Sequence, residues 1–296
     1  MLSQQEALSI NITKFKRIYV EISNLCNVQC SFCPIVDRDK KIMSVEEFKE
    51  TIFKIKNYAE EICLHLMGEP TAHPEFNEIL KVCSENNVLV NLTTNGLLID
   101  SKKEFIIASP AIRQVNFSLQ SYKDNFPHKP LDKYLSYICD FTKELYLRRP
   151  EVYVNYRMWN VGSEQDNNEF FDYIEKSFQI EINRTVQVEN IKSKRIWNKL
   201  YLHFDSRFEW PSLDGEILSE KGRCHGLGNH IGIHADGSVV PCCLDKEAII
   251  NLGNIKDNDL ESILNSELAV KMRDGFKKHI LVHEMCKRCN YIQRFN

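Results

Sequence analysis

The chain has 296 residues, of which 43% are hydrophobic and 27% are charged, as expected of a folded protein with a sizeable core. This composition excludes a disordered or collagen-like chain. The formal net charge is −3, which provides no general attraction to nucleic acid or to an anionic membrane. The segment 1–14 lacks the apolar stretch of a signal peptide, and no apolar run approaches the length of a membrane span. We therefore expect a cytoplasmic protein with no nucleic-acid partner and no membrane partner.

Short apolar or alternating runs are separated by amphipathic stretches, which is the order typical of repeated β/α units. We expect strands at 17–22, 61–66, 88–93, 114–119, 152–158 and 186–190. We expect helices at 44–58, 75–86, 102–108, 131–148 and 163–178. Ser44 and Glu47 form a capping box at the start of the first helix. Repeated strand–helix units favour an α/β fold with a parallel sheet, open or curled into a partial (β/α)6 TIM-like barrel.

Polar side chains recur at every second position of these strands, so the members of each row share one face of the sheet. The rows are Glu21 and Ser23; Asn91, Thr93 and Asn95; Asn116, Ser118 and Gln120; Asn155 and Arg157; Gln187 and Glu189. If helices cover the apolar face, the polar rows line a wet cavity inside the barrel. The alternative is an antiparallel sheet with one solvated face.

The pattern changes after about residue 190. The segment 192–223 has no clear period, and the remainder is rich in His, Gly and Cys, with one expected helix at 260–277. We therefore expect an N-terminal extension at 1–14, a core domain at 15–215 and a small C-terminal domain at 216–296. Because the last of these is too small to bury much core, a bound metal centre would supply stability.

Eleven cysteines are more than packing requires. Because the cytosol disfavours disulfides, clustered cysteines indicate metal ligands or redox groups. Three lie in strand or helix patterns and are expected to be buried packing residues: Cys63, Cys83 and Cys139. The others form two clusters on either side of them: Cys26, Cys30 and Cys33, then Cys224, Cys242, Cys243, Cys286 and Cys289.

The first cluster follows the first expected strand, at the carboxyl edge where parallel α/β sheets place their sites. Three closely spaced thiolates, Cys26, Cys30 and Cys33, can hold one face of a metal cluster and leave one metal position free for a cofactor or substrate. A closed zinc site would need a fourth ligand nearby, and the nearest candidate is Cys63 on the second strand.

This segment, with Phe32 directly before the last cysteine, resembles the signature of the radical S-adenosylmethionine (SAM) superfamily. In that superfamily the three cysteines hold a [4Fe-4S] cluster whose fourth iron binds SAM. The resemblance implies that Cys26, Cys30 and Cys33 are the cluster ligands and that Phe32 lies near the adenine.

Other segments resemble motifs of the same superfamily. Residues 67–70, Met-Gly-Glu-Pro, resemble the Gly-Gly-Glu-Pro motif that engages the amino group of SAM, with Met67 in place of the first glycine. Residues 94–96, Thr-Asn-Gly, resemble its Thr-Asn-Gly step. Taken alone, such segments could be ordinary turns, and a single arginine could be a paired surface charge. By resemblance, the residues that contact SAM are Gly68, Glu69, Pro70, Asn95, Ser118 and Arg157.

The second cysteine cluster has three interpretations by its residues alone: a zinc site, an iron–sulfur cluster or two redox pairs. The spacing Cys224-x12-Gly237-x4-Cys242 resembles the opening of a SPASM domain. A full SPASM domain has further cysteines after its Cys-x2-Cys pair, so we expect the shortened, twitch form with one auxiliary [4Fe-4S] cluster. Its expected ligands are Cys224, Cys242, Cys286 and Cys289, with Cys243 as a competitor for Cys242.

The chemistry that the resemblance implies is reductive cleavage of SAM to a 5′-deoxyadenosyl radical, which abstracts a hydrogen atom from the substrate. An electron then passes to the auxiliary cluster. A flavodoxin- or ferredoxin-type protein is the expected electron donor. The substrate must also lose a proton, and His65 and Glu189 are candidates for the general base.

Three functional classes remain open. We expect a radical SAM oxidoreductase that acts on a small polar metabolite such as a sugar, a cyclitol or a nucleotide-linked molecule. The first alternative is a peptide- or protein-modifying SPASM maturase, which we expect to need a recognition domain longer than the short stretch before the first strand. The second alternative is a non-enzymatic iron–sulfur or zinc binding module, which would leave the motifs at 68–70 and 94–96 without a role.

Overall fold

One sheet of ten strands runs through the residues that the computed structural model describes: 14–161, 167–185, 192–207 and 209–295. The strands are β1 (Phe15–Val20), β2 (Ala59–Cys63), β3 (Leu89–Thr94), β4 (Ile112–Ser118), β5 (Tyr153–Val161), β6 (Ser193–Trp197), β7 (Leu200–Ser206), β8 (His230–Ile233), β9 (Ser238–Val240) and β10 (Gly253–Asn254). The helices are α1 (Val45–Ile55), η1 (Pro70–Ala72), α2 (Phe76–Glu85), α3 (Ile99–Ala108), α4 (Gln120–Asn125), α5 (Asp132–Arg148), α6 (Asn168–Phe178), α7 (Leu260–Leu264), α8 (Glu267–Lys277), α9 (Glu284–Lys287) and η2 (Asn290–Phe295).

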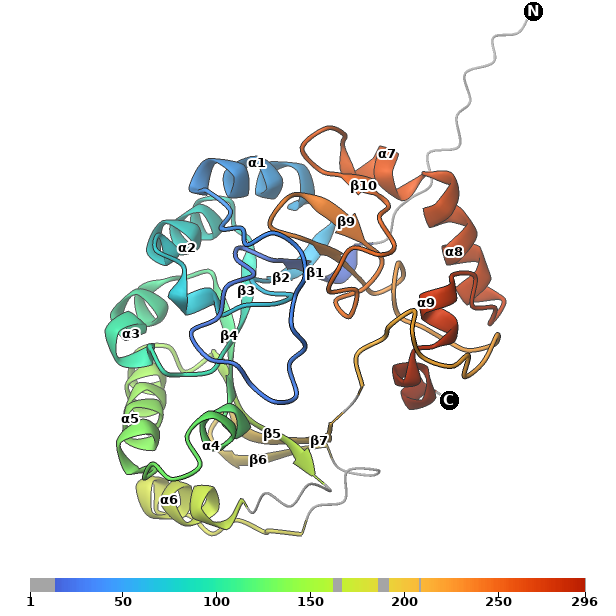
Figure 1. Cartoon of the computed structure of the whole chain (residues 1–296). Coiled ribbons are helices and arrows are strands. Elements are labelled where there is room, and N and C mark those ends of the chain that lie inside the picture. The colour runs from blue at the N-terminus through green and yellow to red at the C-terminus, as the bar shows by residue number, and fades with distance from the viewer. Residues whose placement is uncertain (1–13, 162–166, 186–191, 208, 296) are drawn as a thin grey trace, which may run out of the picture.

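Strands β1 to β5 and β7 pair in parallel and in that order, and α1, α2, α3, α5 and α6 cover their outer side (Figure 1). The expected partial (β/α)6 barrel is therefore confirmed. The predicted capping box is also present, because the Ser44 side chain accepts from the Glu47 backbone and the Glu47 side chain accepts from the Ser44 backbone.

The two faces of the barrel strands differ as the alternating pattern predicts. Outward residues such as Ile18, Val115 and Leu202 are fully buried against the helices. Inside, Asn116 Nδ2 donates to Asn91 Oδ1 at 2.6 Å, and Asn155 Nδ2 donates to Asn116 Oδ1 at 2.9 Å. The polar rows on β3, β4 and β5 therefore face the barrel interior, and the antiparallel alternative is wrong.

Two expectations for the later part of the chain need correction. The segment 192–223 is not irregular throughout, because β6 and β7 form an antiparallel pair within it. The sixth parallel strand of the barrel is β7, which pairs with β5. The strand expected at 186–190, with Gln187 and Glu189, lies outside the described residues. The single helix expected at 260–277 is two, because Ser266 caps a new helix when its side chain accepts from the Ala269 backbone N–H.

The C-terminal part extends the same sheet. Strand β8 pairs in parallel with the free edge of β1, with Ile231 opposite Ile18, and β9 and β10 continue in antiparallel order. Figure 1 shows these elements, with α7 to α9, gathered at the β1 side of the barrel. The division near residue 215 stays a prediction. Among the described helices, none combines the length and the apolar character that crossing a membrane requires.

Candidate active site

The loop that carries Cys26, Cys30 and Cys33 leaves the carboxyl end of β1 and is held from the opposite side of the barrel by α4. Asn125 Nδ2 donates to Cys30 Sγ at 3.1 Å. Asp124 accepts from both the backbone N–H and the hydroxyl of Ser31, at 2.5 and 2.6 Å. Neither Asp124 nor Asn125 was predicted from the sequence, because a short polar helix carries no pattern that links it to a distant loop.

The three thiols face one another closely enough to interact electrostatically. Burial, with a smaller contribution from repulsion by Cys26, raises the pKa of Cys30 to about 12 and that of Cys33 to about 11. No disulfide joins the described cysteines. No set of three or more His, Cys, Asp or Glu side chains in the described ranges is arranged around a single metal ion. The donor set nevertheless fits an iron–sulfur cluster, where each thiolate binds a different iron and the sulfurs need not converge on one point.

Gly68 lies directly beneath the entrance to the cysteine loop. Its φ is +77°, and an added Cβ would come within 2.3 Å of the Ser23 carbonyl oxygen and 2.7 Å of the Leu25 carbonyl oxygen. The Glu69 backbone N–H donates to the same Leu25 oxygen at 2.9 Å. The Gly-Glu-Pro segment therefore rests on the backbone that leads into the cysteine loop, and only glycine fits there.

The Glu69 carboxylate joins the two neighbouring motifs. It is buried and accepts from the Thr94 hydroxyl and the Asn95 backbone N–H, both at 2.7 Å. Burial raises the pKa of Glu69 above its usual value although these hydrogen bonds oppose the shift. Asn95 Nδ2 in turn donates to Asn27 Oδ1 at 2.7 Å and lies 4.0 Å from Cys26 Sγ. The residues at 68–70 and 94–96 thus adjoin the cysteine loop.

Ser118 and Arg157 are cross-strand partners on β4 and β5. Arg157 lies inside the barrel, where Nη1 donates to Thr93 Oγ1 at 3.4 Å and the guanidinium lies 4.9 Å from the Trp159 ring. Burial lowers the pKa of Arg157 to about 10, although the nearby Tyr19 and Cys63 side chains oppose the shift. Arg157 therefore remains a cation at neutral pH.

The sequence predicts two candidates for the general base, Glu189 and His65. Glu189 lies outside the described residues. His65 follows β2, and burial followed by repulsion from Arg157 lowers its pKa to about 3. His65 is therefore neutral at neutral pH, and its Nδ1 has no hydrogen-bond partner among the described groups.

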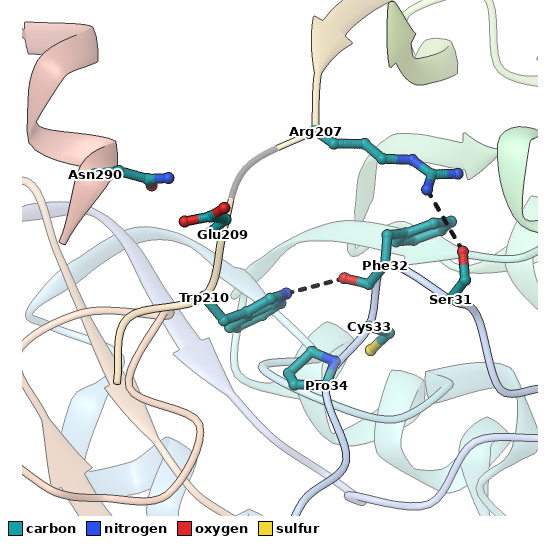
Figure 2. A pocket seen from close by; sticks show the side chains of 8 residues that line it. All are labelled: Ser31, Phe32, Cys33, Pro34, Arg207, Glu209, Trp210 and Asn290. Carbon is teal, nitrogen blue, oxygen red and sulfur yellow. Dashed lines mark hydrogen bonds between the residues drawn. The ribbon is translucent and has the colours of Figure 1, made fainter. Parts of the chain in front are cut away.

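A pocket of about 690 Å³ opens beside the cysteine loop (Figure 2). Trp210 Nε1 donates to the Phe32 carbonyl oxygen at 3.2 Å, and the Arg207 guanidinium lies 5.3 Å from the Phe32 ring. Both residues belong to a segment in which the sequence showed no pattern, so neither was predicted. The lining residues are Ser31, Phe32, Cys33, Pro34, Arg207, Glu209, Trp210 and Asn290.

The C-terminal cysteines form a second group of thiols. Burial raises the pKa of Cys242 well above its usual value, and repulsion from Cys243, Cys224 and Cys286 adds to the rise. Repulsion from Cys224 and Cys289 acts on Cys286 in the same way. Burial also raises the pKa of Cys243 to about 11, although interaction with the Tyr19 side chain on β1 opposes the rise. Five thiols thus lie within electrostatic reach of their neighbours, and this donor set also fits an iron–sulfur cluster.

Two protein families match the chain: the radical SAM superfamily at residues 20–145, and the SPASM iron-sulfur cluster-binding domain at residues 224–290. Together the two matches span more than half of the chain. The chain belongs to the radical SAM superfamily. It is an iron–sulfur enzyme whose cofactors are SAM, the [4Fe-4S] cluster of the core fold and an auxiliary iron–sulfur centre in the SPASM domain.

Curated relatives of this radical SAM enzyme include a peptide cyclase and a bacteriocin biosynthesis protein. It is 25% identical to the PqqA peptide cyclase of Bradyrhizobium diazoefficiens over 42% of this chain and 33% of that protein. It is 23% identical to the antilisterial bacteriocin subtilosin biosynthesis protein AlbA of Bacillus subtilis over 92% of this chain and 64% of that protein. The chain thus spans less than two thirds of the length of either relative.

Solved structures share the fold of this radical SAM enzyme. Streptococcus suis SuiB bound to its precursor peptide SuiA matches with a TM-score of 0.63 and 16% identity, over 96% of this chain and 73% of that chain. BtrN in complex with AdoMet and 2-DOIA matches with a TM-score of 0.53 and 14% identity, over 93% of each chain.

We expect Gly68→Ala to abolish SAM binding and to destabilise the fold. The positive φ alone costs an alanine about 1–3 kcal/mol, and the new Cβ displaces the backbone at Ser23 and Leu25. Urea unfolding and equilibrium dialysis with labelled SAM measure the two effects. Gly215→Ala is the matched control, because its added Cβ meets nothing closer than 3.9 Å. Wild-type SAM affinity in Gly68→Ala would refute a role for this loop in the site.

Proposed function

We propose that this enzyme modifies a peptide or protein substrate, from which it removes hydrogen inside the barrel while an electron passes to the auxiliary centre. This proposal adopts the peptide- or protein-modifying alternative of the sequence analysis in place of the small-metabolite interpretation. Two curated relatives, one named as a peptide cyclase and one named for bacteriocin biosynthesis, support it. The observation that carries the reaction itself is the polar barrel interior, whose parallel strands end at the edge where the Cys26, Cys30 and Cys33 loop begins.

We assign the two groups of cysteines to two iron–sulfur clusters. Cys26, Cys30 and Cys33 hold the cluster that binds SAM, and the C-terminal thiols hold the auxiliary cluster. When bound, SAM and the first cluster supply a radical that abstracts hydrogen, and the auxiliary cluster supplies an electron acceptor. We assign the auxiliary ligands to Cys224, Cys242, Cys286 and Cys289, because the spacing of four residues after Gly237 selects Cys242 and because Tyr19 acts on Cys243.

The remaining site residues bind and orient SAM. Gly68, Glu69 and Pro70 shape the loop against which the amino end of SAM rests, and Asn95 connects that loop to the cysteines. Arg157 presents a buried positive charge for a carboxylate, with Ser118 beside it. We assign no base role to His65 in the free enzyme, because its low pKa makes it a weak proton acceptor.

The substrate class is tested with the reconstituted enzyme, SAM and a reductant under anaerobic conditions. One reaction receives a pool of the short peptides encoded beside the gene, and a second receives a pool of sugars, cyclitols and nucleotides. We expect the peptide pool to accelerate the formation of 5′-deoxyadenosine and to yield a peptide that has lost two hydrogens by mass spectrometry. A reaction without substrate measures uncoupled SAM cleavage.

The two pools distinguish the peptide substrate from the small metabolite. Turnover that depends on the metabolite pool, with no modified peptide, would overturn the proposal and restore the small-metabolite interpretation. Omitting SAM from the peptide reaction must abolish the mass change, because the abstracting radical derives from SAM.

A further inference from the structure

Glu21, directly after β1, is fully buried and accepts hydrogen bonds from separate segments of the chain. Arg38 Nη2 lies 3.0 Å from each of its carboxylate oxygens. The backbone N–H groups of Met67 and Ala235 each donate to it at 3.2 Å. Burial alone would raise the pKa of Glu21, but its partners, with His234 nearby, hold the pKa below its usual value. The carboxylate is therefore charged at neutral pH.

The segments that meet at Glu21 are those that build the two cysteine sites. Arg38 belongs to the segment 34–40, which directly follows the cysteines of the first site. Met67 opens the Gly-Glu-Pro loop. Ala235 lies in the turn between β8 and β9, which leads to the cysteines at 242 and 243. A single carboxylate thus ties the core site to the auxiliary site, and it belongs to neither ligand set.

Arg38 makes a second link between the sites. Its Nε donates to the Lys246 carbonyl oxygen at 2.6 Å, while its Nη2 pairs with the buried Glu21. Only 13% of the Arg38 side chain and none of the Glu21 side chain is exposed, so solvent and salt screen this pair weakly. Three further hydrogen bonds join the same segments: Asp37 N and Arg38 N to the Glu247 carboxylate, at 3.0 and 3.1 Å, and Lys246 Nζ to the Ile35 carbonyl oxygen, at 2.9 Å.

We propose that Glu21 and Arg38 are positioning residues that couple the two cysteine sites, so that filling one site stabilises the other. The same segments connect both sites, so a cluster that restrains them at one site also stabilises the other site. Thermodynamic linkage requires this effect to be equal in both directions. The inference rests on the ligand assignment of the proposed function and is independent of the substrate.

The test follows the loss of auxiliary iron from the reconstituted full chain to a chelator, with the auxiliary signal monitored by electron paramagnetic resonance. In the wild-type background, emptying the core site by Cys26, Cys30 and Cys33→Ala should speed auxiliary iron loss roughly fivefold or more. In an Arg38→Met background, iron loss should already be fast, and the same triple substitution should add less than about twofold. Arg38→Lys keeps the charge but lacks the planar fork, so it should restore the coupling only in part.

Glu61→Gln is the matched control. Glu61 is another buried carboxylate with two arginine partners, Arg17 and Arg113, each at 2.6 Å, but it lies toward the amino ends of the strands. Its substitution removes comparable ion pairs and should leave the coupling at its wild-type value. Full wild-type coupling in Arg38→Met, or equal loss of coupling in Glu61→Gln, would overturn the inference.

Hydrogen exchange on the full chain as purified provides a readout that does not depend on iron. Asp245 accepts from the backbone N–H groups of Ile249 and Ile250 at 2.9 and 2.7 Å, next to the Arg38 contact. The exchange rates of these two amides should rise several-fold in Arg38→Met and should stay at the wild-type value in Glu61→Gln. Unchanged exchange in Arg38→Met would contradict the inference. Absence of iron from both sites would instead reject the ligand assignment, so the two failures can be told apart.

Discussion

Replacing Cys26, Cys30 and Cys33 together with alanine will abolish SAM cleavage and lower the iron content from about eight to about four per chain. The three thiols lie at the carboxyl edge of the barrel, close enough to interact electrostatically. The measurement is iron and acid-labile sulfide after anaerobic reconstitution, together with the yield of 5′-deoxyadenosine.

Cys83→Ala is the control for this substitution, because Cys83 is a fully buried packing residue on α2. It should keep both the iron and the cleavage activity. A fall from about four irons to none in the triple variant would leave the core cluster alone and assign the C-terminal cysteines to zinc or redox roles. An unchanged iron content would reject the core ligand assignment.

Replacing Cys224, Cys242, Cys286 and Cys289 with alanine should leave SAM cleavage detectable and reduce substrate oxidation below detection. The core site keeps its ligands in this variant, whereas the electron released by the oxidised substrate has no acceptor. Chromatography separates the two readouts, 5′-deoxyadenosine and modified substrate, in one reaction.

Cys243→Ala distinguishes the two adjacent cysteines. Because the spacing after Gly237 selects Cys242 as the ligand, the Cys243→Ala variant should keep the auxiliary iron, whereas Cys242→Ala should lose it. Normal product formation by an enzyme that lacks all four auxiliary ligands would contradict the electron-acceptor role.

Much of the fold was predictable because its signals are local. Buried strands and amphipathic helices alternate up to α6, and the Ser44 capping box marks the start of α1. The predicted packing role of Cys83 and Cys139 is confirmed, because both lie in the hydrophobic core. Cys63 is buried as predicted, but it lies outside that core and interacts electrostatically with Arg17 and Arg157. The hairpin of β6 and β7 was missed, although Leu200, Leu202 and Phe204 alternate with polar residues, because the alternation is short and follows a stretch without a clear period.

By itself, the sequence determined the family, the cysteines that could bind metal and the α/β order, because each depends on residue type and short spacing along the chain. Only the tertiary structure decided which strand closes the barrel and that β8 extends its sheet at β1, because pairing between distant strands leaves no local pattern. The role of Glu21 emerged in the same way, since its partners lie between 17 and 214 residues away in sequence and meet only in the folded chain.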